Sequence, residues 1–166
     1  MKNIASNTLG YTGIVTISQY TNGKKFVLAQ EYNNGGSSLF SFFADCLIGD
    51  FDAAKKNIPT HIRLLKQEIV VNGTDQITSI TDYSSAIYVR TLPVKVNSSS
   101  YCGVRYSFII PQDLWSSEYS HIGLYSNKST SITEYAAIAK LTDDISRSGS
   151  SVLVVDWELI IKNKED

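Results

Sequence analysis

The stretch that decides the fold is Val152-Leu153-Val154-Val155-Asp156-Trp157-Glu158-Leu159-Ile160-Ile161, near the end of the 166-residue chain. Every second residue in it is large and apolar, which is the pattern of a β-strand with one face in a core. Two shorter apolar runs, at 121–126 and 135–141, precede it, and turn-forming residues separate the three. We therefore expect three closing strands, the last of which turns five side chains toward the core: Leu153, Val155, Trp157, Leu159 and Ile161.

The beginning of the chain predicts a β-hairpin. Residues 13–20 and 25–30 are rich in β-forming residues and flank an Asn22-Gly23 pair. Both residues of such a pair tolerate the positive φ of a type I′ turn, so this is a strong hairpin signal. Between the hairpin and the closing strands, alternation predicts one further half-buried strand, in which the core-facing side chains are Val104, Tyr106, Phe108 and Ile110.

The middle of the chain gives weaker signals. Residues 62–65 predict a short strand, and residues 86–96 predict a strand that is bent or at a sheet edge at Pro93. Residues 72–85 are polar and predict either a long loop or two weak strands.

The apolar spacing becomes helical after Gly36. Six residues follow the i, i+3, i+4, i+7 pattern: Leu39, Phe40, Phe42, Phe43, Cys46 and Leu47. Ser37 or Ser38 can cap the start of this helix, and Gly49 can end it. The whole pattern predicts a mainly β protein: a single antiparallel β-sandwich domain over 1–166 with one packed α-helix at about 37–48, and an N-terminal arm at 1–12.

Composition excludes several classes of partner. Fifteen basic and sixteen acidic residues give a net charge near −1 and a pI of about 6.1, which argues against a nucleic-acid-binding protein. The chain shows neither the apolar region of a signal peptide nor a membrane-spanning apolar stretch, so we expect synthesis in a cytoplasm and no membrane partner. Cys46 and Cys102 fit no zinc motif, and we expect two small buried thiols rather than a disulfide.

No reactive cluster points to catalysis. His61 and His121 are the only histidines, and neither lies near a Gly-x-Ser-x-Gly nucleophile motif. Asp50-Phe51-Asp52 lacks the remaining ligands of a calcium loop. Asp156 and Glu158 share the face of their strand opposite the predicted core, which favours solvent or an interface over a glycosidase pair. We therefore expect no enzyme, no metal site and no cofactor.

Aromatic residues give the one functional signal in the composition. The chain has ten tyrosines and two tryptophans, and such side chains near turns suit protein contacts or sugar stacking. The predicted arm adds scattered apolar residues that could order against a partner. The interface candidates are Ile4, Leu9, Tyr11, Tyr20, Tyr83 and Tyr119.

Two segments, covering about half the chain, resemble structural proteins of tailed bacteriophages. The first runs from Tyr32 through the predicted helix to Gly49 and continues to Pro59-Thr60-His61-Ile62; it looks like the Asn-Gly, Leu-Phe helix and Pro-x-x-Ile arrangement of small tail and neck proteins. The second runs from Ile122-Gly123-Leu124-Tyr125 to Trp157 and is similar to strands of collar-fibre and baseplate-type proteins. His121 stands where those proteins often carry an acidic residue.

The resemblance implies a virion structural protein: a tail or neck ring or fibre-attachment subunit, present in multiple copies around the portal–tail axis. Its partners would be other copies of itself and other virion proteins (portal, tail or fibre). It implies no catalytic residue. Two alternatives stay open, a head-fibre or capsid-decoration protein and a carbohydrate-binding module that recognises a host glycan.

Overall fold

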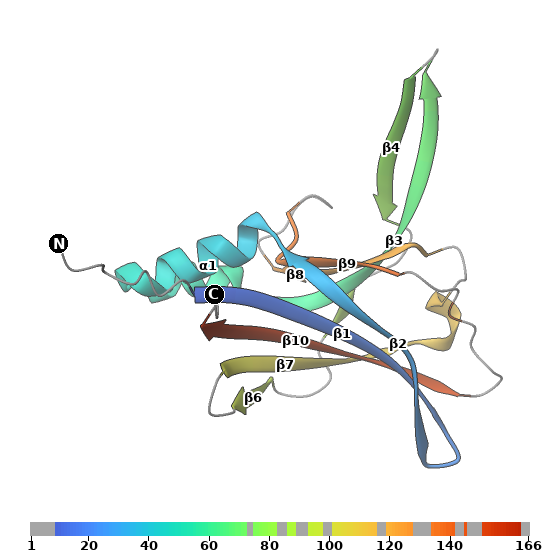
Figure 1. Cartoon of the computed structure of the whole chain (residues 1–166), viewed down its shortest axis with the longest axis horizontal. Helices are drawn as coiled ribbons and strands as arrows, with labels where there is room; N and C mark the ends of the chain where they lie inside the picture. The colour runs from blue at the N-terminus through green and yellow to red at the C-terminus, as the bar shows by residue number, and fades with distance from the viewer. Residues whose placement is uncertain are drawn as a thin grey trace.

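The computed structural model describes residues 9–72, 75–82, 86–88, 93–97, 101–115, 119–127, 134–141, 145 and 151–163. In chain order the elements are β1 (Leu9–Thr21), β2 (Lys24–Gly35), α1 (Ser37–Ile48), α2 (Phe51–Asn57), β3 (Pro59–Asn72), β4 (Asp75–Asp82), β5 (Ile87–Tyr88), β6 (Val94–Asn97), β7 (Tyr101–Ile110), a 3₁₀ turn (Gln112–Leu114), β8 (His121–Ser126), β9 (Ala137–Lys140) and β10 (Val152–Asn163) (Figure 1). The described strands form one antiparallel sheet in the order β4-β3-β8-β9-β2-β1-β10-β7-β6, and β5 pairs with β3.

The first two strands form the hairpin that the Asn-Gly pair predicts. Asn22 and Gly23 have φ values of 51° and 75°, which are the left-handed values that a type I′ turn requires. The register shifts between Ile17 and Ser18, so the hairpin contains a bulge.

The strand that decides the fold, β10, lies inside the sheet between β1 and β7. It pairs with β1 from Leu9–Asn163 to Tyr20–Val152, and with β7 from Leu153–Ile110 to Lys162–Tyr101. The predicted alternation is confirmed, because four of the five expected core residues are buried and Ile161 is partly buried. The four buried ones are Leu153, Val155, Trp157 and Leu159.

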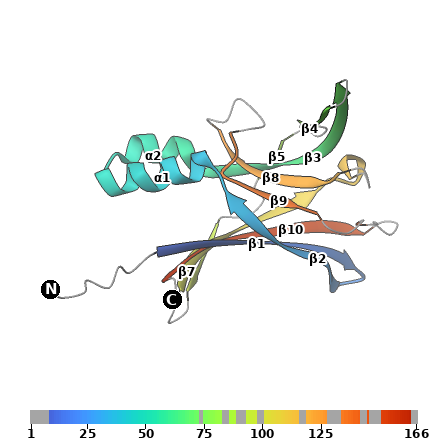
Figure 2. The same ribbon diagram turned by 45° about the horizontal axis from the view of Figure 1, so that its top comes forward.

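The sheet curls into a half-barrel because β9 joins its two halves. β9 pairs with β8 on one side and with β2 on the other, where the ladder runs only from Asn33–Ala139 to Gly35–Ala137. Figure 2 shows β3, β8 and β9 above β1 and β10. The predicted antiparallel, mainly β class is confirmed, but the expected two-sheet sandwich is not, because one continuous sheet curls over instead.

Apolar side chains from both halves fill the interior of the half-barrel. Trp157 and Phe108 come from one half, and Ile62 and Leu124 come from the other. Leu39 of α1 is buried in the same core, so the helices pack at one end of the interior (Figure 2). Burying one such side chain contributes about 1.5–3 kcal/mol.

The helix predicted at 37–48 is confirmed as α1, but its cap differs from the prediction. The N-cap residue is Gly36, which has no side chain to cap the helix, whereas the prediction gave this position to Ser37 or Ser38. A Cβ on Gly36 would lie 2.1 Å from the carbonyl oxygen of Tyr135, so the close approach of these two segments requires glycine. Gly49 ends the helix in the left-handed conformation, with φ of 80°, as predicted.

The sequence pattern does not predict α2. The Asp50 side chain accepts a hydrogen bond from the Ala53 backbone N–H at 2.9 Å and so caps this short helix. Asn57 donates from Nδ2 to Asp45 Oδ2 at 3.0 Å, which ties α2 to α1. The sequence did carry a signal for this helix: Asp52 in its first turn and Lys55 and Lys56 in its last turn suit the helix dipole.

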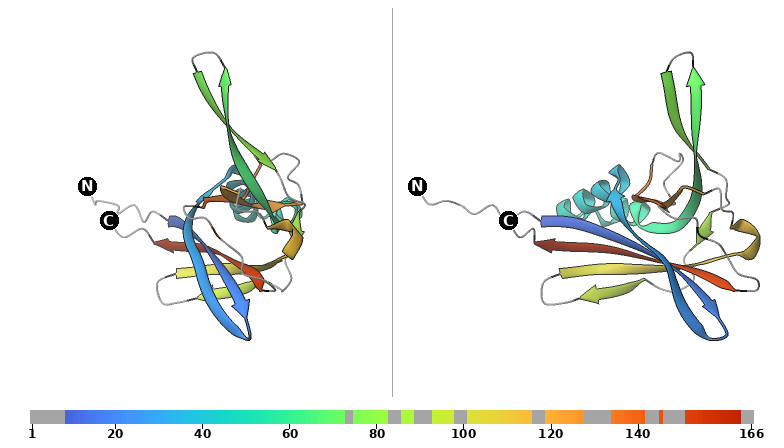
Figure 3. Two further views of the ribbon diagram at one scale, coloured as in Figure 1. Left: turned by 90° about the vertical axis from the view of Figure 1, so that its right-hand side faces the viewer. Right: turned by 45° about the vertical axis from the view of Figure 1, so that its right-hand side comes forward.

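β3 and β4 extend away from the sheet as a two-stranded ribbon (Figure 3). From Lys66 to Asn72, β3 pairs only with β4 among the described residues. β3 is therefore longer than the predicted 62–65. Of the two alternatives for 72–85, a long loop or two weak strands, the strand alternative holds in part: Asn72 ends β3 and one strand, β4, occupies Asp75–Asp82, while residues 73–74 and 83–85 lie outside the described part.

Candidate functional site

Exposed large apolar side chains gather on two surfaces of the described residues. The first is the outward side of β2, β1, β10, β7 and β6, which we call the outer face. The second is the end of the two-helix unit, which we call the helical tip. Exposed apolar side chains that gather on one surface can mark interaction sites, so both surfaces are candidates.

The strand register arranges the outer face in rows. Directly opposed residues of an antiparallel ladder point to the same side of the sheet. One row runs across four strands through Val27, Ser18, Val154 and Ile109. The row on one side adds Tyr20 and Val152. On the other side a polar row of Gln30, Thr16, Asp156 and Ser107 comes first, and the row beyond it adds Ile14, Tyr32 and Val94. The apolar set of the outer face is therefore Ile14, Tyr20, Val27, Tyr32, Val94, Ile109, Val152 and Val154.

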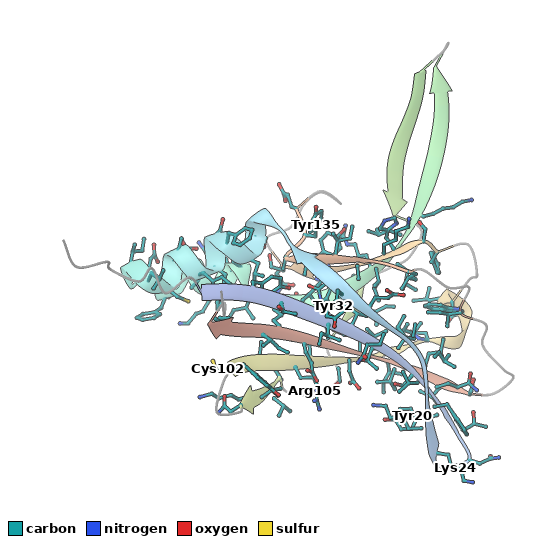
Figure 4. The ribbon with its side chains drawn as sticks, in the orientation of Figure 1. Tyr20, Lys24, Tyr32, Cys102, Arg105 and Tyr135 are labelled. Carbon is teal, nitrogen blue, oxygen red and sulfur yellow. The ribbon has the colours of Figure 1, made fainter. Side chains whose placement is uncertain are left out.

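The aromatic members of the outer face project from the two hairpin strands. Tyr32 on β2 leaves 78% of its surface exposed, and Val27 on the same strand leaves 60%. Figure 4 labels Tyr20 and Tyr32 together with Arg105 on β7. The side chain of Lys25 lies over the Tyr20 ring, with Nζ 5.8 Å from the ring centroid.

Charged side chains of the outer face pair with one another. Lys25 Nζ lies 3.1 Å from Asp156 Oδ2, and this hydrogen bond raises the pKa of Lys25 above its usual value. Ser107 Oγ donates to the other oxygen of Asp156 at 2.7 Å. Arg105 Nε donates to Glu158 Oε1 at 2.6 Å. The expectation that Asp156 and Glu158 share the face opposite the core is confirmed, and each is engaged by a cation.

The helical tip exposes apolar side chains because α1 carries more of them than one face can bury. Leu39 and Phe43 of α1 pack into the core. At its other end, Leu47 and Ile48 are 88% and 77% exposed, and Phe51 at the start of α2 is 64% exposed. A surface of this kind suits contact with another apolar surface.

The structure places the predicted interface residues in different environments. Tyr20 lies exposed on the outer face. Leu9 is the first residue of β1 and pairs with Asn163, so residues 9–12 of the predicted arm belong to the sheet. Ile4 and Tyr83 lie outside the described residues.

Tyr11 and Tyr119 are partly buried and pack against the core. Tyr11 Oη donates to Asn33 Oδ1 at 2.5 Å, and burial raises the pKa of this phenol. Tyr119 meets Trp115 edge-on, with ring centroids 6.0 Å apart. Tyr11 lies on the core side of β1, where it pairs with Ile161. The sequence of residues 1–12 has only scattered apolar residues and so did not predict this position.

His61 lies buried in a small cluster on the outward side of β3 and β8. Its ring stacks on Tyr125 at 5.7 Å between centroids, and Arg63 lies over the same tyrosine ring at 4.9 Å. Burial, and secondly the charge of Arg63, lower the pKa of His61 to about 4. Its Nδ1 lies 3.1 Å from Thr60 Oγ1, so these contacts fit a packed imidazole.

The other candidates for chemistry have structural partners. Burial lowers the pKa of His121, and its Nδ1 lies 2.9 Å from Ser120 Oγ. Asp50 caps α2, and Asp52 pairs with Lys55 at 3.5 Å. Within the described ranges, no three His, Cys, Asp or Glu side chains gather in a way that could hold a metal ion. Both cysteines are free, as expected, but neither is fully buried: Cys46 is partly buried and Cys102 is exposed, which corrects the expectation of two buried thiols.

Sequence reasoning missed most of the outer face. Its signal was present in β10, where Val152, Val154 and Ile160 are apolar at positions that alternation assigns to the outward side. A strand that carries apolar side chains on both faces is typically buried on both faces. Tyr32 and Ile109 carried the same signal on β2 and β7.

No family model, curated protein or solved structure matches this chain. Among the described residues, neither helix has the length and apolar character needed to cross a bilayer.

Proposed function

We propose that this chain is a structural subunit of a multi-protein assembly, specifically a virion protein at the neck or tail of a tailed bacteriophage. The observation that carries the proposal is the outer face, where six large apolar side chains are at least one-third exposed while the charges beside them pair among themselves. Such a surface is depleted of free charge and rich in aromatic and aliphatic groups, as the centre of a protein interface is. The phage assignment rests on the resemblance of the two segments.

The shape of the chain supports an assembly role. The β3–β4 ribbon and the β1–β2 hairpin extend beyond the half-barrel (Figure 3), and the helical tip lies at another end. Extensions of this kind bury little within their own subunit, so they suit contacts with neighbours in a ring or fibre. We propose no catalytic role and no cofactor for this chain.

An antibody raised against the purified chain tests the virion assignment. Particles from the phage that carries this sequence would be purified by density gradient, labelled with antibody and gold, and imaged by negative stain. Gold at the neck or tail is the expected result. Gold on the capsid surface would favour the head-fibre or capsid-decoration alternative, and protein found only outside purified particles would refute a virion role.

A glycan-binding module is the second candidate, because Tyr32 is the most exposed aromatic side chain of the outer face. Gln30 lies on the same strand two residues away, where its amide donates to Thr16 Oγ1 at 3.2 Å. A flat phenol ring beside polar groups can stack on a sugar. Saturable binding in a sugar array that Tyr32→Ala abolishes would establish this function, and its absence would remove it.

A further inference from the structure

We propose that the outer face is the interface between two copies of this chain, packed face to face so that their sheets form a β-sandwich across a two-fold axis. The inference rests on the proposed function, which requires the chain to assemble with other subunits, and it names a second copy of the chain as the partner of this surface. Each protomer would supply one layer, because its inner face is already filled by its own core and by α1.

The charge distribution of the outer face fits a second copy. A two-fold interface brings each patch against itself, so an excess of one sign would repel. Here two cations meet two anions within the same face, in the Lys25–Asp156 and Arg105–Glu158 pairs. A second copy packed on this face therefore brings no unpaired charge into the interface. A strongly acidic or basic partner would find no net charge to recognise.

The size of the face also fits. Strands lie about 4.8 Å apart and rise about 3.3 Å per residue, so β2, β1, β10 and β7 between Thr12 and Tyr20 cover roughly 19 Å by 26 Å. That projection is on the order of 500 Å², and protruding side chains make the accessible surface larger. A standard interface buries about 800 Å² per partner. The outer face therefore has the right order of area for a stable dimer.

The rows of the outer face suit sheet-on-sheet packing. Facing sheets lie about 10 Å apart at about −30° and interdigitate the side chains of their inner faces. The row through Val27, Val154 and Ile109 places branched side chains on three of these four strands, with Ser18 of β1 between Val27 and Val154. The half-barrel turns at β9, so β2, β1, β10 and β7 stay in one layer that can meet its copy.

The test is the native mass of the purified chain, measured by light scattering and sedimentation over a range of concentrations. The expected mass is twice 18.4 kDa. Ile109→Asp, which puts an unpaired carboxylate into the interface, should weaken the dimer at least tenfold, and Val152→Asp should do the same. Leu47→Asp is the matched control, because it makes a similar change at an even more exposed site on the helical tip and should leave the dimer intact. Circular dichroism confirms that each variant is folded.

Three outcomes would overturn the inference. They are a wild-type monomer at every concentration, an oligomer that Leu47→Asp dissociates while Ile109→Asp and Val152→Asp do not, and a monomer that binds sugar through Tyr32. None of them decides the virion assignment, which the gold labelling of particles tests separately. A monomeric protein found on the phage neck would keep the proposed function and remove only this interface.

Discussion

Gly13 offers the sharpest energetic test of the fold, because the side chain of Asn33 occupies the space where a Cβ would be. A Cβ on Gly13 would lie 2.0 Å from Asn33 Oδ1 and 2.2 Å from Nδ2. Asn33 is buried, and its Oδ1 accepts the hydrogen bond from Tyr11. Gly13→Ala must therefore displace the amide and separate it from the phenol.

The expected loss follows from those two contacts. Leaving a buried hydrogen-bonding group without its partner costs about 1–3 kcal/mol. Alanine returns about 0.4–1 kcal/mol by restricting the unfolded chain. Gly13→Ala should therefore lower the free energy of unfolding by about 1–2 kcal/mol. In an Asn33→Ala background the space is empty, and the same change should be neutral or stabilising by up to ~1 kcal/mol.

Urea unfolding of the four proteins in this double-mutant cycle measures the coupling. The sign of the Gly13→Ala effect should reverse between the two backgrounds. Tyr11→Phe serves as the control, because it removes the hydroxyl without adding volume and should reduce the cost of Gly13→Ala by about 1 kcal/mol. If Gly13→Ala cost the same free energy with and without the Asn33→Ala substitution, the reasoning would be refuted.

Three further predictions concern His61, α2 and the outer face. Because the pKa of His61 falls from 6.5 in the unfolded chain to about 4 in the folded protein, the unfolded chain binds the proton first, and stability should be full above about pH 6.5 and fall by about 3 kcal/mol toward pH 4. His61→Gln should make this slope in the urea midpoint much shallower, and the remaining slope should come from His121, whose pKa burial also lowers. An unchanged slope in His61→Gln would contradict the assignment to His61. Asp50→Ala should lower the free energy of unfolding, measured in urea, by about 1 kcal/mol, because it removes the N-cap of α2. Asp52→Ala breaks an exposed ion pair with Lys55 and should change this free energy by less than about 0.5 kcal/mol. In the monomeric Ile109→Asp background, where the outer face meets solvent, Glu158→Gln should cost less than about 1 kcal/mol in the free energy of unfolding, and a larger loss would mean that its ion pair with Arg105 is structural.

Local patterns in the sequence predict elements well where one interaction decides them. The Asn22-Gly23 turn, the α1 stripe and the alternation of β10 and β7 each depend on the chemistry of neighbouring residues, and all are confirmed. The edge position of β6 after Pro93 also follows from local chemistry, because proline cannot donate to a ladder.

Strand pairing and the outer face depend on distant residues, and there the sequence analysis fails. Nothing near Ala137 shows that β9 will bridge β8 and β2, and this bridge turns the expected sandwich into a half-barrel. The Gly36 cap is set by the approach of Tyr135 from far along the chain, which overrides the serines beside it. The interface residues were chosen by proximity to turns, but exposure is a property of rows that run across strands, as Tyr32 and Ile109 show.

The pairing of β1 with β10 sets the order in which this chain can fold. Leu9 pairs with Asn163, so the ladder in the middle of the sheet joins the two ends of the described chain. Closing so long a loop is slow, and folds dominated by distant contacts form in milliseconds to seconds. On the ribosome, the β1–β2 hairpin can form early. The other edge of β1 stays unpaired, and the core lacks Trp157, until β10 has emerged. A chain interrupted before β10 would present an unpaired edge of β1 to other chains, so the synthesis of β10 protects the nascent protein from aggregation.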